Sequence, residues 1–190
     1  MISICIPVFN TNILLLVRQL SVQAANAAIP VEIVVVDDGS SPAIQNINKD
    51  ISSIESVIYK FQPSNTGRIK SRMALSGFAK YPWLLFMDDD SKIIKEDFLA
   101  AYFQQLSDPE RIVTGGRKYS ETPPADCNYR LHWKYGKNRE HHWRNIAGNW
   151  EGFQSNNFLI HKTVFDSISF PEELTGYGHE DTWMGIQLGE

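Results

Sequence analysis

Two periodicities alternate along the first hundred residues. Short apolar runs rich in β-branched residues, typical of buried strands, are separated by longer stretches whose apolar positions recur every three or four residues, as on one face of a helix. Runs of the first kind predict strands at residues 2–9, 31–36, 57–61 and 83–87. Stretches of the second kind predict helices at residues 13–27, 43–54, 66–80 and 95–106. This alternation predicts βαβ units, and hence an α/β fold with a mainly parallel central sheet and flanking helices.

The pattern changes after about residue 110. Residues 112–119 and 157–161 predict two further strands, and residues 181–188 predict the start of a helix. Residues 120–156 are rich in Trp, His, Arg, Asn and Gly and show neither periodicity. They predict a long irregular segment, which in a compact domain is usually functional.

The end of the chain is amphipathic, and no cap or stop signal follows the last apolar residues. We therefore expect residues 1–190 to form a single domain that is truncated at its C-terminus. A helix in that position is normally covered by later elements, so its apolar surface is open to self-association.

Composition excludes several classes of protein. With 43% hydrophobic residues the chain can bury a sizeable core, and its net charge of −4 argues against a nucleic-acid partner. Two cysteines are too few for a disulfide framework or a Cys-rich zinc site. No apolar stretch approaches the ~20 residues that span a bilayer, and no secretory signal precedes the first strand. We expect a cytoplasmic protein without a membrane span, with peripheral binding at the inner face of the membrane left open.

Acidic residues directly follow two of the predicted strands, as Asp37-Asp38 and as Asp88-Asp89-Asp90. Ligands of parallel α/β sheets bind at the carboxyl ends of the strands, so both clusters fall where a site is expected. In an extended segment Asp88 and Asp90 share a face, and two carboxylates there suit Mg²⁺ or Mn²⁺. The alternative is a solvated acidic turn that caps the following helix.

The other candidate residues are placed more ambiguously. One of Asp37 and Asp38 caps the next helix in the simpler interpretation, and the other faces the crevice, where it would bind a base or a ribose. Arg68 and Arg72 lie in the first turns of the helix predicted at residues 66–80, where a phosphate is favoured. The alternative is an ordinary helix start with solvated charges.

Near the C-terminus, the segment GYGHED places two glycines before His179, Glu180 and Asp181. A carboxylate at this point could act as a general base. The alternative is an acidic helix start that complements the helix dipole.

Taken in order, these segments resemble the family-2 glycosyltransferases of the GT-A fold. The resemblance is carried by ISICIPVFN, VEIVVVDDGSS, PSNTGRIKSRMALSGF, WLLFMDDDS, NNFLIHKTVFDSI and LTGYGHEDTWMGI. It implies a GT-A nucleotide-binding sandwich, with a nucleotide-binding half at residues 1–105 and an acceptor-side half at residues 106–190. It also implies a nucleotide-sugar donor, most simply a UDP-sugar, a Mn²⁺ or Mg²⁺ cofactor, and transfer with inversion to a glycan, lipid-linked or polymer hydroxyl.

The resemblance also implies roles for individual residues. Asp181 would be the general base and Glu180 would hold the acceptor. Asp90, the closer ligand, and Asp88 would bind the metal, with His179 as a further candidate ligand. The nucleotide would contact residues of four segments: Pro7, Val8, Phe9, Asp37, Asp38, Arg68, Arg72, Asp88 and Asp89.

Two features depart from the family pattern. The middle residue of the metal motif, Asp89, is itself acidic, so the frame that binds the metal stays open. Met73 stands where many members have Asn after the arginine. A domain that binds a nucleotide sugar without catalysis is the alternative function, since it would retain the pocket but would not need Asp181.

Overall fold

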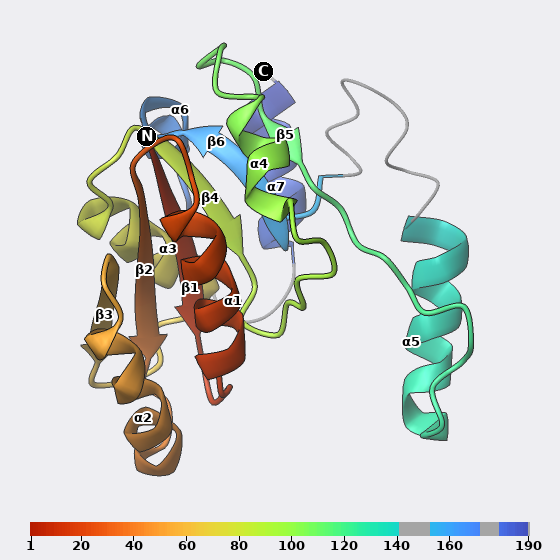
Figure 1. Ribbon diagram of the computed structural model, residues 1–190. Coiled ribbons are helices and arrows are strands. Elements are labelled where there is room, and N and C mark those ends of the chain that lie inside the picture. The colour runs from red at the N-terminus through yellow and green to blue at the C-terminus, as the bar shows by residue number, and fades with distance from the viewer. Residues whose placement is uncertain (141–152, 172–178, 190) are drawn as a thin grey trace.

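The computed structural model describes residues 1–140, 153–171 and 179–189, and its centre is a six-stranded sheet in the order β3-β2-β1-β4-β6-β5 (Figure 1). The strands are β1 (Ile2–Val8), β2 (Val31–Asp38), β3 (Val57–Gln62), β4 (Trp83–Met87), β5 (Val113–Thr114) and β6 (Asn157–His161). The first four are parallel to one another, β6 is antiparallel to β4, and β5 is antiparallel to β6. The predicted α/β fold with a mainly parallel sheet is confirmed.

Helices cover both faces of this sheet. Helices α1 (Leu14–Ala25) and α4 (Phe98–Phe103) share one apolar cluster with the sheet. A second cluster joins the other face to α3 (Arg68–Phe78), α6 (Lys162–Ser167) and α7 (Glu180–Gly189). Helix α2 (Pro42–Asn48) and a 3₁₀ turn at Lys49–Ser53 connect β2 to β3.

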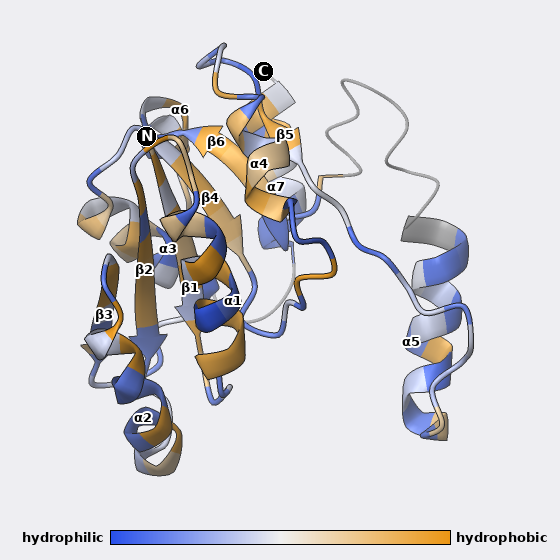
Figure 2. Ribbon diagram, in the orientation of Figure 1, coloured by the Kyte–Doolittle hydropathy of each residue, from blue (hydrophilic) through white to orange (hydrophobic). Residues whose placement is uncertain are grey.

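Burial on both faces explains why the central strands are apolar throughout. Every residue of β2 is buried, and the β-branched run VEIVVV supplies side chains to both clusters. In Figure 2 hydrophobic residues are concentrated in the central strands, whereas helix α5 (Arg130–Tyr135) is largely hydrophilic. No helix among the described residues is long and apolar enough to cross a membrane.

The prediction of an irregular segment at residues 120–156 is wrong in part. A 3₁₀ turn at Cys127–Tyr129, helix α5 (Arg130–Tyr135) and a π-helical turn at Gly136–Glu140 follow one another, away from the sheet (Figure 1). Leu131 in α5 is 80% exposed. Because this helix does not bury an apolar face in the core, it lacks the periodicity that would have predicted it.

Other boundaries also differ from the predictions. The strand predicted at residues 112–119 is only Val113–Thr114, the helix predicted at 95–106 is only Phe98–Phe103, and α6 was not predicted. These elements are short, so their side-chain patterns are too brief to establish a period.

The strand register brings the acidic clusters to one edge of the sheet. Strands β1, β2 and β4 are parallel, so Val8, Asp38 and Met87 all lie at their carboxyl ends. Antiparallel pairing of Met87 with Asn157 brings the start of β6 to the same edge. The segment just before β6 is thereby added to the candidate site.

Candidate functional site

The three aspartates after β4 face two different neighbours. Asp88 and Asp90 line a cleft of about 910 Å³, whereas Asp89 Oδ2 accepts a hydrogen bond from the Phe9 N–H at 3.1 Å. Residues 89–90 lie in a turn, yet the side chains separate as the spacing predicts. Two carboxylates therefore lie in the cleft wall, and the third connects the segment after β4 to the residue after β1.

Arg72 in α3 is a buried cation beside Asp88. It is 2% exposed, and its Nη2 lies 3.3 Å from Asp88 Oδ1 and 3.2 Å from the Ser155 carbonyl oxygen. Its Nε and Nη1 have no hydrogen-bond partner among the described residues. Burial lowers the pKa of Arg72, and burial raises the pKa of Asp88 against the opposing effect of Arg72. A buried guanidinium with two unpartnered nitrogens is suited to bind an anion.

The paired aspartates at the end of β2 point into the protein. Asp37 is fully buried and accepts from the Ser40 N–H at 2.8 Å and from the Tyr59 hydroxyl at 2.6 Å. Burial and the contact with Asp37 raise the pKa of Tyr59 well above its usual range. Each Asp37 oxygen thus already has a protein donor.

Asp38 connects β2 to the start of α3. Its Oδ1 accepts from the Thr66 N–H and hydroxyl, and its Oδ2 accepts from the Gly67 N–H, each at 2.8 Å. These backbone donors precede α3, where the sequence predicts a phosphate site. The carboxylate of Asp38 occupies them instead, and its contact with a base stays a prediction.

The loops after β1 and β2 are joined to each other. The Asn10 N–H donates to Ser40 Oγ at 2.8 Å, and Asn10 Oδ1 accepts from the Ser41 N–H at 2.8 Å. Gly39 has φ +78°, and a Cβ there would lie 2.6 Å from the Asn65 backbone nitrogen. Only glycine fits this turn without strain, because both its conformation and its contact exclude a side chain.

The three residues predicted at the end of β1 differ in accessibility. Phe9 is 48% exposed and Pro7 is half-buried, but Val8 packs in the core at 1% exposure. Of the three, Val8 has no accessible side chain to offer a nucleotide. The nucleotide contacts predicted for all three residues stay predictions.

At the start of α7, two carboxylates have different partners. Asp181 Oδ1 accepts from the Ser155 hydroxyl, and its Oδ2 accepts from the Ser155 N–H at 3.3 Å. The Glu180 side chain is 7% exposed and lies 3.6 Å from Arg68 Nη1. Arg68 lines the cleft, so this ion pair connects Glu180 to the cleft wall. Its predicted contact with an acceptor stays a prediction.

His179 is exposed and adopts a left-handed backbone conformation with φ 63°. It is not among the residues that line the cleft. Its role as a metal ligand stays a prediction. The glycines of the predicted motif, at positions 176 and 178, lie outside the described residues.

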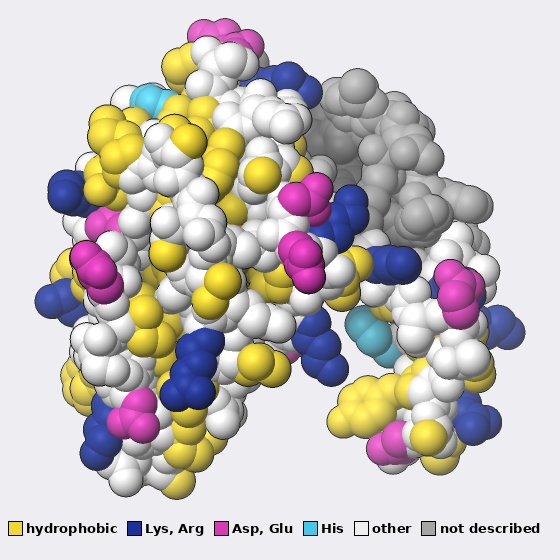
Figure 3. All heavy atoms as spheres, viewed as in Figure 1, with side chains coloured by type: hydrophobic (Ala, Val, Ile, Leu, Met, Phe, Trp, Pro, Cys, Tyr) yellow, Lys and Arg dark blue, Asp and Glu magenta, His cyan; other side chains and the backbone are white. Residues whose placement is uncertain are grey.

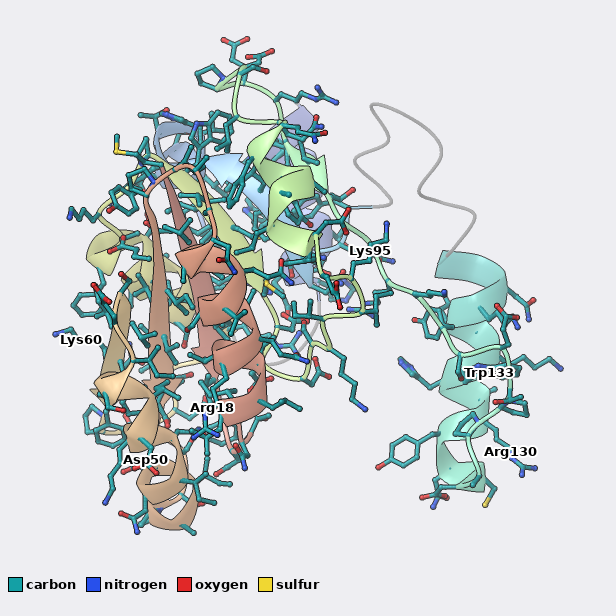
Figure 4. The ribbon with its side chains drawn as sticks, viewed as in Figure 1. Arg18, Asp50, Lys60, Lys95, Arg130 and Trp133 are labelled. Carbon is teal, nitrogen blue, oxygen red and sulfur yellow. The ribbon has the colours of Figure 1, made fainter. Side chains whose placement is uncertain are left out.

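The cleft extends from the aspartates toward α5. Its walls come from residues 90–95, from α4 and from residues 113–119, and His132 of α5 contributes at the far end. Lys95, which lines the cleft, and Trp133 of α5 lie on facing sides of the space between the body and α5 in Figure 4. Figure 3 shows both basic and acidic side chains along this side of the body. The cleft is large enough for a sugar-sized ligand and part of a second one.

The donors for a metal are few. Within the described parts of the chain, no group of three or more His, Cys, Asp or Glu side chains could hold a metal ion by itself. Asp88 and Asp90 supply hard oxygen ligands on one cleft wall. Mg²⁺ is commonly held by one or two carboxylates together with substrate phosphates, so this pair fits an ion shared with a ligand.

The structure thus joins Arg72 and Asp181 through one residue that the sequence analysis missed, Ser155. Its carbonyl binds Arg72, and its hydroxyl and N–H bind Asp181. The polar run QSN, directly before the strand at 157–161, is the only sequence signal for it. The run by itself does not identify a site residue, because only the antiparallel pairing of β6 with β4 brings it to the carboxyl ends of the parallel strands.

Comparison with known proteins agrees with this arrangement. The profile of glycosyl transferase family 2 matches residues 3–169. S. aureus TarS 1–349 in complex with UDP-GlcNAc is similar over 98% of this chain and 52% of that one, with 18% identity and a TM-score of 0.67. Its complex with UDP has 19% identity and a TM-score of 0.64, over 97% and 54% of the two chains.

A third solved structure comes from another organism. The mannosyltransferase PcManGT from Pyrobaculum calidifontis, in complex with GDP-Man and Mn²⁺, has 13% identity and a TM-score of 0.60 over 98% of this chain and 51% of that one. The chain therefore spans about half the length of these structures. None of the curated proteins matches it. The likeness in fold confirms the predicted GT-A architecture.

Proposed function

The chain belongs to glycosyl transferase family 2, and from that membership we propose that it transfers a sugar from a UDP-sugar to an acceptor hydroxyl with inversion. One observation carries this proposal: Asp88, which lines the cleft with Asp90, contacts the buried Arg72, and Ser155 joins Arg72 to Asp181. The solved structures that contain UDP-GlcNAc, UDP and GDP-Man share this fold. They support a nucleotide-sugar donor.

The donor diphosphate would lie against Arg72 and the aspartates. Nε and Nη1 of Arg72 are buried and unpartnered among the described residues, so a phosphate oxygen would satisfy them. Asp88 and Asp90 would hold Mn²⁺ or Mg²⁺, and the PcManGT structure with Mn²⁺ supports the use of a divalent ion. When bound, such an ion offsets the negative charge that develops on the leaving diphosphate.

Asp181 would accept the proton of the attacking hydroxyl. The bond between C1 and the diphosphate oxygen breaks while the bond between C1 and the acceptor oxygen forms on the opposite face. The proton passes to the carboxylate, and UDP leaves. A single displacement of this kind inverts the anomeric carbon and needs no enzyme nucleophile.

The cleft beyond the aspartates is the place for the acceptor. Arg68, Arg117 and Tyr102 line it along with Asn156, the residue next to Ser155. Polar and aromatic side chains of this kind suit a glycan, lipid-linked or polymer hydroxyl. The donor would then lie at the strand ends, and the acceptor on the side of residues 106–190.

A donor-hydrolysis assay tests this proposal. The protein is incubated with UDP-GlcNAc, UDP-glucose, UDP-galactose or GDP-mannose and Mn²⁺, so that water serves as the acceptor. We expect UDP release from at least one donor, and proton NMR of the freed sugar should first show the inverted anomer. Binding of UDP without turnover of any donor would favour the non-catalytic nucleotide-sugar-binding domain.

The same assay tests the base. Asp181→Asn keeps the size of the side chain but cannot take up the proton, so turnover should fall about 10²-fold or more while UDP affinity stays nearly unchanged. Asp166→Asn is the matched control, because Asp166 also accepts a hydrogen bond from a buried serine, Ser76, at 2.6 Å. Full turnover in Asp181→Asn would remove the general-base role.

A further inference from the structure

One buried serine connects the two halves of the site. Ser155 is 2% exposed and precedes β6. Its hydroxyl and N–H both donate to the carboxylate of Asp181, and its carbonyl accepts from Arg72 at 3.2 Å. The next carbonyl, that of Asn156, accepts from the Asp88 N–H at 3.0 Å. The same short segment is therefore bonded to Asp181 on one side and to Arg72 and Asp88 on the other.

We propose that Ser155 is a positioning residue for sugar transfer, which orients the Asp181 carboxylate and sets its place relative to Asp88. This inference rests on the proposed function of Asp181 as the base. Asp181 stands in the first turn of α7, where its side chain would otherwise be free to rotate. Donors from one residue to both oxygens fix the rotation and the position of that carboxylate together.

The bonds to Ser155 leave Asp181 able to act. An ionised carboxylate has about four sites that accept hydrogen bonds, and Ser155 occupies two of them. The remaining sites can accept the proton of the attacking hydroxyl. A group held in this way needs no reorganisation when the reaction occurs.

The chain contains a matched serine–aspartate pair outside the site. Ser76 in α3 is 1% exposed, and its hydroxyl donates to Asp166 Oδ1 in α6 at 2.6 Å. Helix α6 follows the far end of β6, where His161 pairs with Trp83 at the start of β4. Ser76→Ala therefore removes the same kind of buried bond as Ser155→Ala, at the opposite edge of the sheet.

The test measures kcat, KM, UDP affinity and thermal unfolding for Ser155→Ala, Ser76→Ala, Asp181→Asn and the double variant Ser155→Ala/Asp181→Asn. The substrate is the UDP-sugar that is hydrolysed fastest in the panel above. We expect Ser155→Ala to lower kcat about 10-fold, because misplacing a catalytic group by a fraction of an ångström slows the chemical step. UDP affinity should stay unchanged, and Ser76→Ala should lose stability but keep its kcat.

The double variant separates positioning from a merely structural role. If Ser155 acts through Asp181, the serine substitution should cause no further loss of kcat once Asp181 is Asn. Losses that multiply in the double variant would overturn the inference, as would a wild-type kcat in Ser155→Ala while Asp181→Asn is impaired. Full activity of Asp181→Asn would instead refute the proposed base, and the inference with it.

Discussion

Two roles proposed for Asp38 predict different effects of its substitution on stability and on UDP affinity. The sequence suggests that it binds the nucleotide base, whereas in the structure it joins β2 to the residues before α3. The side chain is 4% exposed and accepts three hydrogen bonds from Thr66 and Gly67. Asp38→Asn separates these roles, because it retains the volume and one oxygen but turns the other oxygen into a donor.

The cost of this substitution follows from the contacts. The remaining oxygen of Asn can still accept from the N–H and hydroxyl of Thr66, but its amide group would face the Gly67 N–H. One bond to a charged acceptor is lost, and a partly buried N–H is left without a partner. Such a loss costs about 2–3 kcal/mol of unfolding free energy.

Urea-induced unfolding, followed by tryptophan fluorescence, measures this cost. Asp50→Asn, an exposed carboxylate in the 3₁₀ turn after α2, is the control with the same change of charge, and it should shift stability by less than about 0.5 kcal/mol. If Asp38→Asn is as stable as this control but loses UDP affinity, then Asp38 contacts the base and the structural role is refuted.

Two further predictions concern the metal and the cysteines. Asp90→Asn should abolish most of the Mn²⁺ dependence of UDP binding in calorimetry, and Asp89→Asn should do so less, because Asp89 faces the Phe9 N–H. The reverse order, or equal UDP affinity after chelation, would contradict the assignment of the metal ligands. Burial raises the pKa of Cys5 well above its usual range, whereas Cys127 is exposed. A thiol reagent at neutral pH should therefore label only Cys127 in the folded protein and both in urea, and labelling of Cys5 without urea would refute the buried placement.

Strand periodicity was sufficient to predict much of the fold. The apolar runs at 31–36 and 83–87 predicted strands that the structure confirms as β2 and β4, both buried on two faces. The predicted strand at 157–161 coincides with β6. A strand that is buried on both faces consists almost entirely of apolar residues. Such a run is visible in the sequence, so these strands can be recognised without knowledge of their neighbours.

The same pattern predicted where the acidic clusters lie, but not which way their side chains point. Asp37, Asp38 and Asp88 each directly follow or end a strand that a run of apolar residues predicts. Yet Asp37 accepts from Tyr59 and Asp38 accepts from Thr66 and Gly67, so of these three residues only Asp88 reaches the cleft. The direction depends on the donors that neighbouring strands and loops present, which are distant in sequence.

The sequence by itself determined which residues could carry the chemistry, because strand ends and residue types are local properties of the chain. Only the tertiary structure decided which of them meet. Antiparallel pairing of β6 with β4 places Ser155 beside Arg72, 83 positions away in the chain, and beside Asp181, 26 positions away. No periodicity encodes such contacts, since they arise from strand order and from the packing of α3 and α7 on one face of the sheet.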